Sequence, residues 1–490
     1  MAFPEAVIKD RGYYTNSAYT KSVHIKFDPR RIAAAARAGG CASPDPMEPF
    51  TYADFGCGYG LTVIFLAQAM PHGHFYGIDF MPEHTDAAQA FARHLGVNNV
   101  TFINAAFEDI VPGMLPPLDF AAAHGILSWV APEVRRSLRR VVADSLKENG
   151  LFAASYNLGS SERLSAPQVR SLMVEAIARG VPEDTALSQG IDLMQSAHGG
   201  AASEFFGAGE SDRLAYLRHE YLCQDWTCFT HLQVAAEMAE DGLMFRGPHL
   251  SDAALMPVAE RALPVADPLY WEDVNALREK TTFAVSLFSR PQDGGSEPRA
   301  ALEMPAGFMT LLPSVANVAV KDGFLSVFDA MGKASAPHPA VALCDVGRQA
   351  TDPYTQNALA KMLHNSGFIA FANKGFQLPE VADPRAFALS GEVRGQIARQ
   401  EEILPVNRTL LCPETQAVIS PLHDLPWLVL THCSEVAPSR YADVLMELPS
   451  IRNMLAYPTY TSRDGISSLI HAWHSRWAPW LAGQGVIRFL

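Results

Sequence analysis

The residues with the clearest chemical potential are a glycine-rich turn and an acid that follows it. Positions 52–60 read Tyr-Ala-Asp-Phe-Gly-Cys-Gly-Tyr-Gly, and Asp79 lies 19 residues after Gly60. Glycine permits a sharp turn and a close approach of a ligand, and the free N–H groups at a helix start attract electron-rich atoms. An acid about 20 residues further on is placed to accept hydrogen bonds from ribose hydroxyls. The pattern predicts a site for a ligand that contains a ribose.

The glycine spacing distinguishes two cofactors. A dinucleotide fingerprint, G-x-G-x-x-G/A from Gly56, needs a small residue at position 61, where this chain has Leu61. The run that starts at Asp54 is D-x-G-x-G-x-G. It resembles motif I of the class I S-adenosylmethionine (SAM) methyltransferases, with Asp54 as the acid at the strand end. The resemblance favours SAM over a dinucleotide and over a purely structural glycine turn.

The elements that must position these residues alternate between strands and helices. Strands are predicted before Gly56 and at 74–79, 99–104, 119–124 and 150–156, with helices at about 61–70, 82–94 and 132–146. Five alternating strands indicate a doubly wound parallel sheet, whose ligand site lies at the carboxyl ends of the strands. At those ends lie the glycine loop, Asp79, Ala106, Phe107, His124 and Tyr156.

Beyond residue 157 the alternation stops, and strands resume at 242–247 and 281–289. The predicted fold class is α/β: a doubly wound Rossmann-like class I methyltransferase core with a helical insertion, plus a C-terminal, mostly helical α+β region. The predicted divisions are an N-terminal arm or lid at 1–50, the core at 51–290 with its insertion at about 158–228, a linker at 291–298, a helix-rich module at 299–375 and a C-terminal domain at 376–490. In the last domain, 417–420 and 427–431 read as strands, and three tryptophans near the end read as core.

Composition narrows the class of protein. With 490 residues, 48% of them apolar and 18% charged, the chain has the profile of a globular protein of several domains. We find no apolar run near 18 residues and no signal-peptide core at the start, so no membrane span and a cytoplasmic location are predicted. Seven scattered cysteines indicate free thiols, and the isolated pair Cys223 and Cys228 favours buried thiols over a metal site. The net charge of −14 disfavours nucleic acid as a partner and mildly favours a cationic substrate; a homodimer is left open.

Further motifs narrow the family resemblance. They are G-I-D-F-M-P-E-H at 77–84, H-G-I-L-S-W-V at 124–130, S-Y-N at 155–157 and Y-L-R-H-E-Y-L at 216–222, with Asp225-Trp226. From about Tyr13 to Arg290 the chain resembles the methyltransferases that carry a C-terminal methyltransferase regulatory domain, whose characterised members are bacterial outer-membrane-protein lysine methyltransferases. The resemblance is looser beyond, where 299–375 is assigned to the regulatory domain by position. It implies SAM as donor, S-adenosylhomocysteine (SAH) as product and a protein lysine as acceptor.

Two departures from the family pattern bear on the site. Most class I enzymes have an acid after the third strand that accepts from the adenine amino group, and here that position is Ala106. Adenine is then expected to use backbone near Phe107, or Asn104 or Glu108 as another acceptor, at a cost of about 0.5–1.5 kcal/mol. Family members also continue S-Y-N as x-x-P-G-W, whereas this chain continues with Leu-Gly-Ser-Ser, so the acceptor wall is rebuilt.

The site residues predicted from motif and resemblance form two groups. The SAM-binding group is Asp54, Gly56, Cys57, Gly58, Gly60, Asp79, Phe80, Ala106, Phe107 and His124. The catalytic candidates are Tyr156, Glu220 and His124, since a lysine of pKa about 10.4 must lose a proton before it attacks a methyl group. For Tyr156 the alternative is a buried packing tyrosine, and for Glu220 an ion pair with Arg218 or a helix cap. No catalytic metal is expected, because a sulfonium leaving group needs no acid.

Three functions remain open at this point. The first is methylation of a protein or peptide lysine, with the C-terminal region presenting or gating the substrate. The second is N- or O-methylation of a small molecule, suggested by the segment after Asn157. The third is a non-catalytic SAM-binding scaffold, suggested by Ala106.

Overall fold

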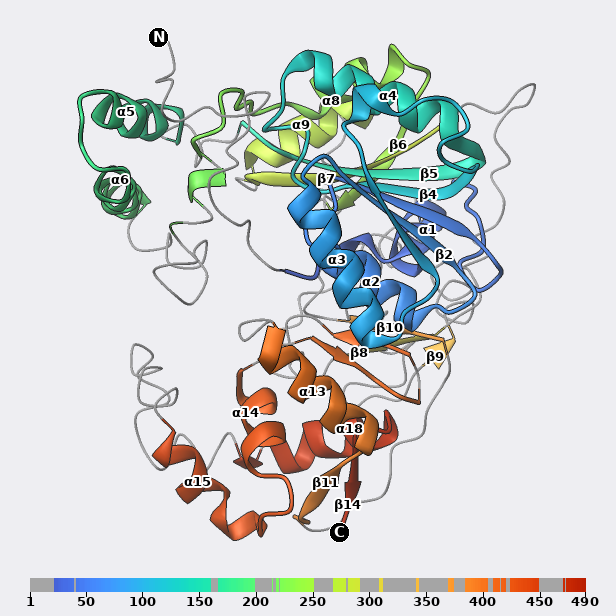
Figure 1. Ribbon diagram of the computed structural model, residues 1–490, viewed down its shortest axis with the longest axis vertical. Helices are drawn as coiled ribbons and strands as arrows, with labels where there is room; N and C mark the ends of the chain where they lie inside the picture. The colour runs from blue at the N-terminus through green and yellow to red at the C-terminus, as the bar shows by residue number, and fades with distance from the viewer. Residues whose placement is uncertain are drawn as a thin grey trace.

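The structure is a computed structural model (Figure 1). It describes residues 22–38, 41–159, 166–198, 214, 217–219, 221–250, 268–278, 281–290, 308–311, 341–342, 369–373, 384–403, 409–414, 416–419, 424–448, 470–471 and 473–490.

A seven-stranded sheet forms the centre of the upper part of the molecule in Figure 1, with the strand order β3-β2-β1-β4-β5-β7-β6. β1 to β5 are parallel, whereas β7 runs antiparallel to both β5 and β6. The strands are β1 (Thr51–Phe55), β2 (His74–Asp79), β3 (Val100–Asn104), β4 (Leu118–Ala123), β5 (Leu146–Asn157), β6 (Met244–Leu250) and β7 (Phe283–Ser289). The predicted doubly wound α/β fold is confirmed, and the last two strands are the two predicted after the insertion.

Helices cover both faces of this sheet (Figure 1). One face carries α1 (Pro29–Ala38), α2 (Leu61–Ala69) and α3 (Pro82–Leu95); the other carries α4 (Pro132–Ser145), α8 (His231–Ala239) and α9 (Pro268–Arg278). Every residue of α2 except Gln68 is buried. A helix that is apolar all round must be covered on every side. Leu411 and Val418 of the C-terminal region supply part of that cover, because they belong to the same buried cluster.

The insertion after β5 builds a separate small core. Its described helices include α5 (Ala166–Ala178) and α6 (Glu183–His198). Met173 and Leu187 from these helices pack with Leu217 and with Trp129 from the β4–α4 loop. The chain rejoins the sheet where Phe229 pairs with Leu158. The insertion therefore fixes the position of Trp129, which the next section places in the site.

The described C-terminal residues form small sheets and helices beneath α2 and α3 in Figure 1. The sheets pair β8 (Phe308–Leu311) with β9 (Val341–Ala342) and β10 (Ile369–Ala372), β11 (Phe387–Leu389) with β14 (Ile487–Phe489), and β12 (Leu410–Leu411) with β13 (Val418–Ile419); the helices are α13 (Gly391–Ile403), α14 (Asp424–His432), α15 (Tyr441–Glu447) and α18 (Ala478–Gly483). The strand predicted at 427–431 is wrong, since it lies in α14: a short apolar run fits a buried helix as well as a strand. Trp473, Trp477 and Trp480 are buried, as predicted.

The helices predicted within 299–375 lie outside the described residues, which contribute only β8, β9 and β10 there. In the part of the chain that the structure describes, no helix is both long enough and apolar enough to cross a membrane.

Arg30 joins the sheet domain to the C-terminal region. Its guanidinium is paired with Asp28 at 2.7 Å, and Nη1 donates to Asn373 Oδ1 at 2.8 Å. Asn373 in turn donates through Nδ2 to the carbonyl of Ala69, at the end of α2. Since Arg30 is 1% exposed, this buried network ties the first turn of α1 to the C-terminal region.

Candidate functional site

The glycine loop between β1 and α2 is held against the end of β2. Gly56, Gly58 and Gly60 have φ angles of 77°, 53° and 66°, a region that residues with a Cβ avoid. The N–H groups of Gly56 and Cys57 both donate to the carbonyl of Ile78, at 2.8 and 3.0 Å. These hydrogen bonds hold the backbone of the loop in place. Because its glycines have no side chains, a ligand at the carboxyl edge of the sheet can approach that backbone closely.

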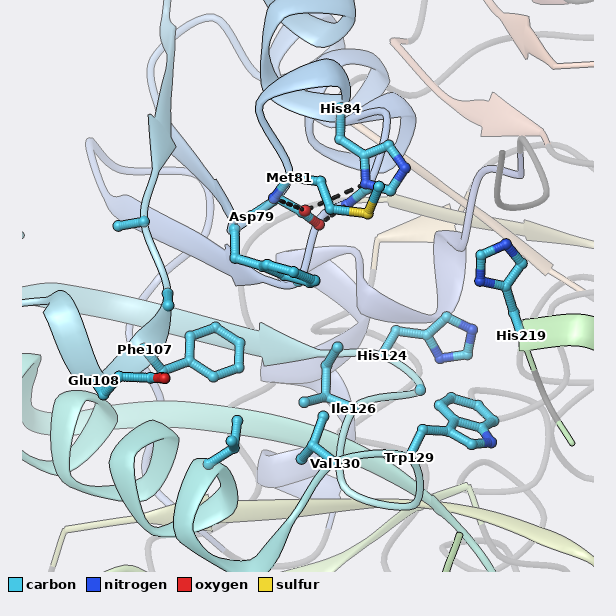
Figure 2. A pocket seen from close by; sticks show the side chains of 17 residues that line it. Asp79, Met81, His84, Phe107, Glu108, His124, Ile126, Trp129, Val130 and His219 are labelled. Atoms are coloured by element: carbon cyan, nitrogen blue, oxygen red, sulfur yellow. Dashed lines mark hydrogen bonds and ion pairs between the residues drawn. The ribbon is translucent and has the colours of Figure 1, made fainter. Parts of the chain in front are cut away.

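Asp79 ends β2, and three groups orient its carboxylate. The N–H of Gly58 donates to Oδ2 at 2.9 Å and the N–H of Met81 to Oδ1 at 3.0 Å; His84 Nδ1 lies 3.2 Å from Oδ1 (Figure 2). A carboxylate offers about four acceptor positions, so at least one stays open for a ligand. These charge-assisted bonds hold the acid in place before anything binds.

A pocket opens in front of Asp79, with a volume of about 930 Å³ when the solvent at its mouth is included. It has carboxylates at Asp79 and Glu108, and no Lys or Arg is found among the described residues that line it. Its lining consists of Gly56, Gly58, Asp79, Phe80, Met81, His84, Ala105, Ala106, Phe107, Glu108, His124, Gly125, Ile126, Trp129, Val130, Val134 and His219. Such a surface suits a neutral or cationic ligand and disfavours a pyrophosphate.

The pocket has two chemically different ends (Figure 2). On one side are Phe107 and Glu108, and on the other are His124, Trp129 and His219. Apolar side chains of Ile126 and others lie between them. A ligand with an aromatic base, a ribose and a charged tail could therefore place its base at the end near Phe107, its ribose at Asp79 and its tail at the end that contains His124 and His219.

Asp54 is buried behind the glycine loop, one strand away from Asp79. Burial raises the pKa of Asp54 to about 7, and the neighbouring charge of Asp79 adds to the effect. A cation bound nearby would favour the ionised carboxylate and so gain affinity from it. Asp54 does not line the pocket, so its effect on a ligand would be electrostatic.

His124 is held by Ser155 from the neighbouring strand. Its Nδ1 lies 3.0 Å from Ser155 Oγ, which also accepts the N–H of Gly125 at 2.8 Å. Ser155 is fully buried, so its own O–H is satisfied when it donates to Nδ1, and the imidazole proton then lies on Nε2. Burial, aided by the charges of His24 and Lys26, keeps the pKa of His124 well below its usual value. The site thus holds a neutral His124 whose ring proton lies on Nε2.

Comparison with known proteins identifies a known domain within this fold. Residues 53–150 match the family described as "Methyltransferase domain". The fold is similar to that of PKMT2 from Rickettsia typhi, with a TM-score of 0.59 and 13% identity over 96% of this chain and 100% of that one. The structure of PKMT2 in complex with AdoHcy (SAH) gives a TM-score of 0.57 and 14% identity, covering 88% of this chain and 91% of that one.

Residues 53–150 therefore form a methyltransferase domain within this fold.

Curated relatives add sequence similarity but no activity. An uncharacterized protein of Synechocystis is 28% identical over 297 residues, which cover 57% of this chain and 58% of that protein. An uncharacterized protein of Rickettsia prowazekii is 28% identical over 150 residues, or 31% of this chain and 27% of its own length. The chain thus aligns with less than two thirds of either relative's length.

The residues present fit the methyltransferase cofactor. SAM is a cation with two ribose hydroxyls, and the pocket presents an oriented acid at Asp79, a bare glycine backbone at Gly56 and Gly58, and no described Lys or Arg. Asp79 would hold the ribose, and the apolar end near Phe107 and Ile126 would hold the adenine. At that end Ala106 supplies no acceptor, but the predicted alternative Glu108 does line the pocket, whereas Asn104 donates to the carbonyl of Asp79.

The predicted SAM-binding residues of the methyltransferase domain divide into those at the pocket and those behind it. The pocket is lined by Gly56, Gly58, Asp79, Phe80, Ala106, Phe107 and His124. Asp54, Cys57 and Gly60 are not among the lining residues; they build the strand end and the loop that support it. The backbone of Cys57 is bonded to Ile78, so its part in the site is structural.

The two catalytic candidates that the structure describes, Tyr156 and His124, are not brought together. Tyr156 is 1% exposed, and its hydroxyl lies 2.7 Å from both His231 Nδ1 and Ser286 Oγ. This hydrogen-bond network lies on the face of the sheet that α8 covers. Tyr156 therefore has the position expected from its alternative interpretation, a buried packing tyrosine. Glu220 lies outside the described residues. Of the two candidates that the structure describes, His124 lines the pocket and Tyr156 does not.

Several pocket residues were missed from the sequence. Met81 and His84 follow Asp79 within the motif at 77–84, so proximity to a predicted acid was a usable signal. Trp129 and His219 come from segments 90 residues apart and meet only through the packing of the insertion. Each lies within a motif that carries the family resemblance, at 124–130 and 216–222, but neither motif predicts that the two side chains meet.

Proposed function

We propose that this protein is a SAM-dependent methyltransferase that acts on a lysine amine of a protein or peptide. The observation that carries the methyl-transfer part is the acid-bearing pocket at the glycine loop, inside the segment that matches a methyltransferase domain. The lysine part is supported by the motif resemblance at 77–84, 124–130 and 216–222, and by the similarity in fold to PKMT2 along almost the whole chain.

In this mechanism SAM supplies an electrophilic methyl group on a sulfonium, and the protein supplies position and environment. Asp79 orients the ribose and the glycine loop lets the cofactor approach the backbone. His124, with a neutral ring, walls the other end of the pocket together with Trp129 and His219. The side chains of Trp129 and His219 are nearly buried, so this end excludes water from an approaching amine.

Exclusion of water also helps the acceptor to lose its proton. A lysine ammonium that enters a desolvated site next to a cation has a lowered pKa, because both burial and the like charge disfavour its charged form. The neutral state of His124 suits this task, since it adds no positive charge to the acceptor end. Methyl transfer should therefore become faster as pH rises.

The C-terminal region is proposed to regulate the methyltransferase core. The proposed divisions are the arm at 1–50, the core at 51–290, the regulatory domain at 299–375 and the C-terminal domain at 376–490. Its described contacts are with α1 and α2, through Arg30, Asn373 and the cluster that contains Leu411. These contacts reach the helices behind the glycine loop, so a movement of the C-terminal region would be transmitted to the SAM site through α2.

The test is incubation with methyl-labelled SAM and a host lysate, followed by separation of labelled protein from labelled small molecules. Label on lysine residues of protein, lost in Asp79→Ala and kept in Asp86→Ala, is the expected result; Asp86 is an exposed acid on α3, the helix that follows Asp79. Label confined to small molecules would replace the lysine proposal by the small-molecule one. SAM binding without any transfer would favour the scaffold.

A further inference from the structure

The segment before α1 lies against the acceptor end of the pocket. The N–H of His24 donates to Oγ1 of Thr62 in α2 at 3.0 Å. The ring of His24 lies on that of His124, with centroids 3.9 Å apart, and Phe27 contacts the same ring at 5.2 Å. Because His124 lines the SAM pocket, the segment 23–27 and the pocket share a wall.

Lys26 brings an amine to this wall. Its Nζ lies 4.8 Å from the centroid of the Phe283 ring, and that ring lies 5.8 Å from the ring of His124. Phe283 begins β7 opposite Asn157, the last residue of β5. The amine is thus held at the carboxyl edge of the sheet, over the Phe283 ring that packs against His124.

The surroundings of Lys26 favour its neutral, nucleophilic form. Burial lowers the pKa of Lys26 from 10.5 to about 8. The neighbouring imidazoles stay neutral, because burial and the charge of Lys26 lower the pKa of His24 to about 3, and burial likewise depresses that of His124. About one amine in ten is then neutral at pH 7, against roughly one in 2,500 for an ordinary lysine. Such an amine attacks without a separate base.

We propose that Lys26 is itself a methyl acceptor, modified by the SAM site of its own chain; this rests on the function proposed above. The lone pair of the neutral Nζ attacks the methyl carbon, and the bond from that carbon to the sulfonium breaks. The electron pair of the broken bond stays on sulfur, so the cofactor product is SAH. The positive charge moves from sulfur to nitrogen, and the product is a methylammonium.

Methylation would change the contact that Lys26 makes. A methylated ammonium is more weakly hydrated and interacts well with an aromatic face. The contact with Phe283 would therefore strengthen, and the segment 23–27 would be held more firmly beside the acceptor end. The modified enzyme would then admit external acceptors less readily than the unmodified one.

A first test needs no turnover. Lysines are labelled with a small acylating reagent, with and without SAH, and Lys26 is compared with Lys147, an exposed lysine paired with Asp119 at 2.7 Å. SAH is expected to slow the labelling of Lys26 severalfold and to leave Lys147 unchanged. Equal effects on both lysines, or none on Lys26, would contradict the placement of Lys26 beside the cofactor.

The second test is peptide mass mapping after incubation of the full chain with methyl-labelled SAM and host lysate. A gain of about 14 Da or its multiples on the peptide that contains Lys26 is expected in the wild type, and its loss in Asp79→Ala and in Lys26→Arg. Labelled lysate protein with an unlabelled Lys26 overturns this inference and leaves the proposed function standing. Methyl groups on Lys26 of Asp79→Ala also overturn it, because another enzyme then made them. Absence of label everywhere overturns both.

Discussion

The cofactor side of the pocket, at Asp79, and the acceptor end, at His124, are built in different ways. The cofactor side comes from one continuous stretch, in which Gly56, Gly58, Asp79 and His84 lie within two strand–turn–helix units, and hydrogen bonds join Gly58 and His84 to Asp79. The acceptor end gathers His124 from β4, Trp129 from the following loop, His219 from the insertion and, by contact, the segment 23–27. A local motif fixes the first end, whereas tertiary packing makes the second. The first should therefore be insensitive to changes in the insertion and the arm, and the second should depend on them.

The largest expected effect is on the cofactor end. Asp79→Ala removes the ribose acceptor and also releases the N–H of Gly58, so SAM affinity should fall by about 2–4 kcal/mol, since bonds to charged groups are worth roughly 1.5–3 each and are rarely additive. Calorimetry with SAH measures the loss, with the exposed Asp86→Ala as control. Equal affinities in the two variants would remove Asp79 from the site.

The loop that supports this end should be intolerant of side chains. In Gly60→Ala the new Cβ would lie 2.5 Å from the Phe102 ring, at a φ of 66°. Backbone strain and overpacking together should destabilise the domain by about 2–4 kcal/mol. Gly96→Ala has a similar φ of 71° but open space, so it should cost only about 1 kcal/mol. Thermal unfolding compares the two, and similar losses would show that packing against Phe102 is unimportant.

The electrostatics of this end give a pH dependence. Because the pKa of Asp54 in the folded state is raised to about 7, the unfolded chain ionises first, and Asp54 destabilises the fold increasingly as pH rises from about 4 to 7. Between pH 5 and pH 7 the wild type should lose on the order of 2 kcal/mol relative to Asp54→Asn, and little more above pH 7. Parallel unfolding curves at each pH provide the measurement. A constant difference across that window would contradict the raised pKa.

The smallest expected effect sharpens the role of the acceptor end. Ser155→Ala leaves the N–H of Gly125 without its acceptor and frees His124, at a cost of about 1–3 kcal/mol of stability. Methyl transfer should slow more than SAH affinity changes. Ser286→Ala is the matched control, since Ser286 is equally buried but bonds Tyr156 on the far side of the sheet. If Ser286→Ala slows transfer as much as Ser155→Ala, Tyr156 regains its predicted catalytic role.

The same division explains what the sequence could predict. The alternation of strands and helices, the glycine loop and Asp79 follow from local periodicity and spacing, which is why the elements of the core were predicted to within a few residues. Tyr156 has the right strand and the wrong face: side chains alternate along β5, and Ser155, not Tyr156, points towards His124. The contacts of Lys26 and Trp129 join segments far apart in the chain, and a single sequence carries no short-range signal for them.

The most direct test of the two-ended site is a structure of the protein with SAH bound. We expect the ribose hydroxyls within hydrogen-bond distance of Asp79, the adenine between Phe107 and Ile126, and the sulfur directed towards the end formed by His124 and Trp129. A ribose placed away from Asp79, or a sulfur directed towards Ala106, would contradict the assignment of the two ends.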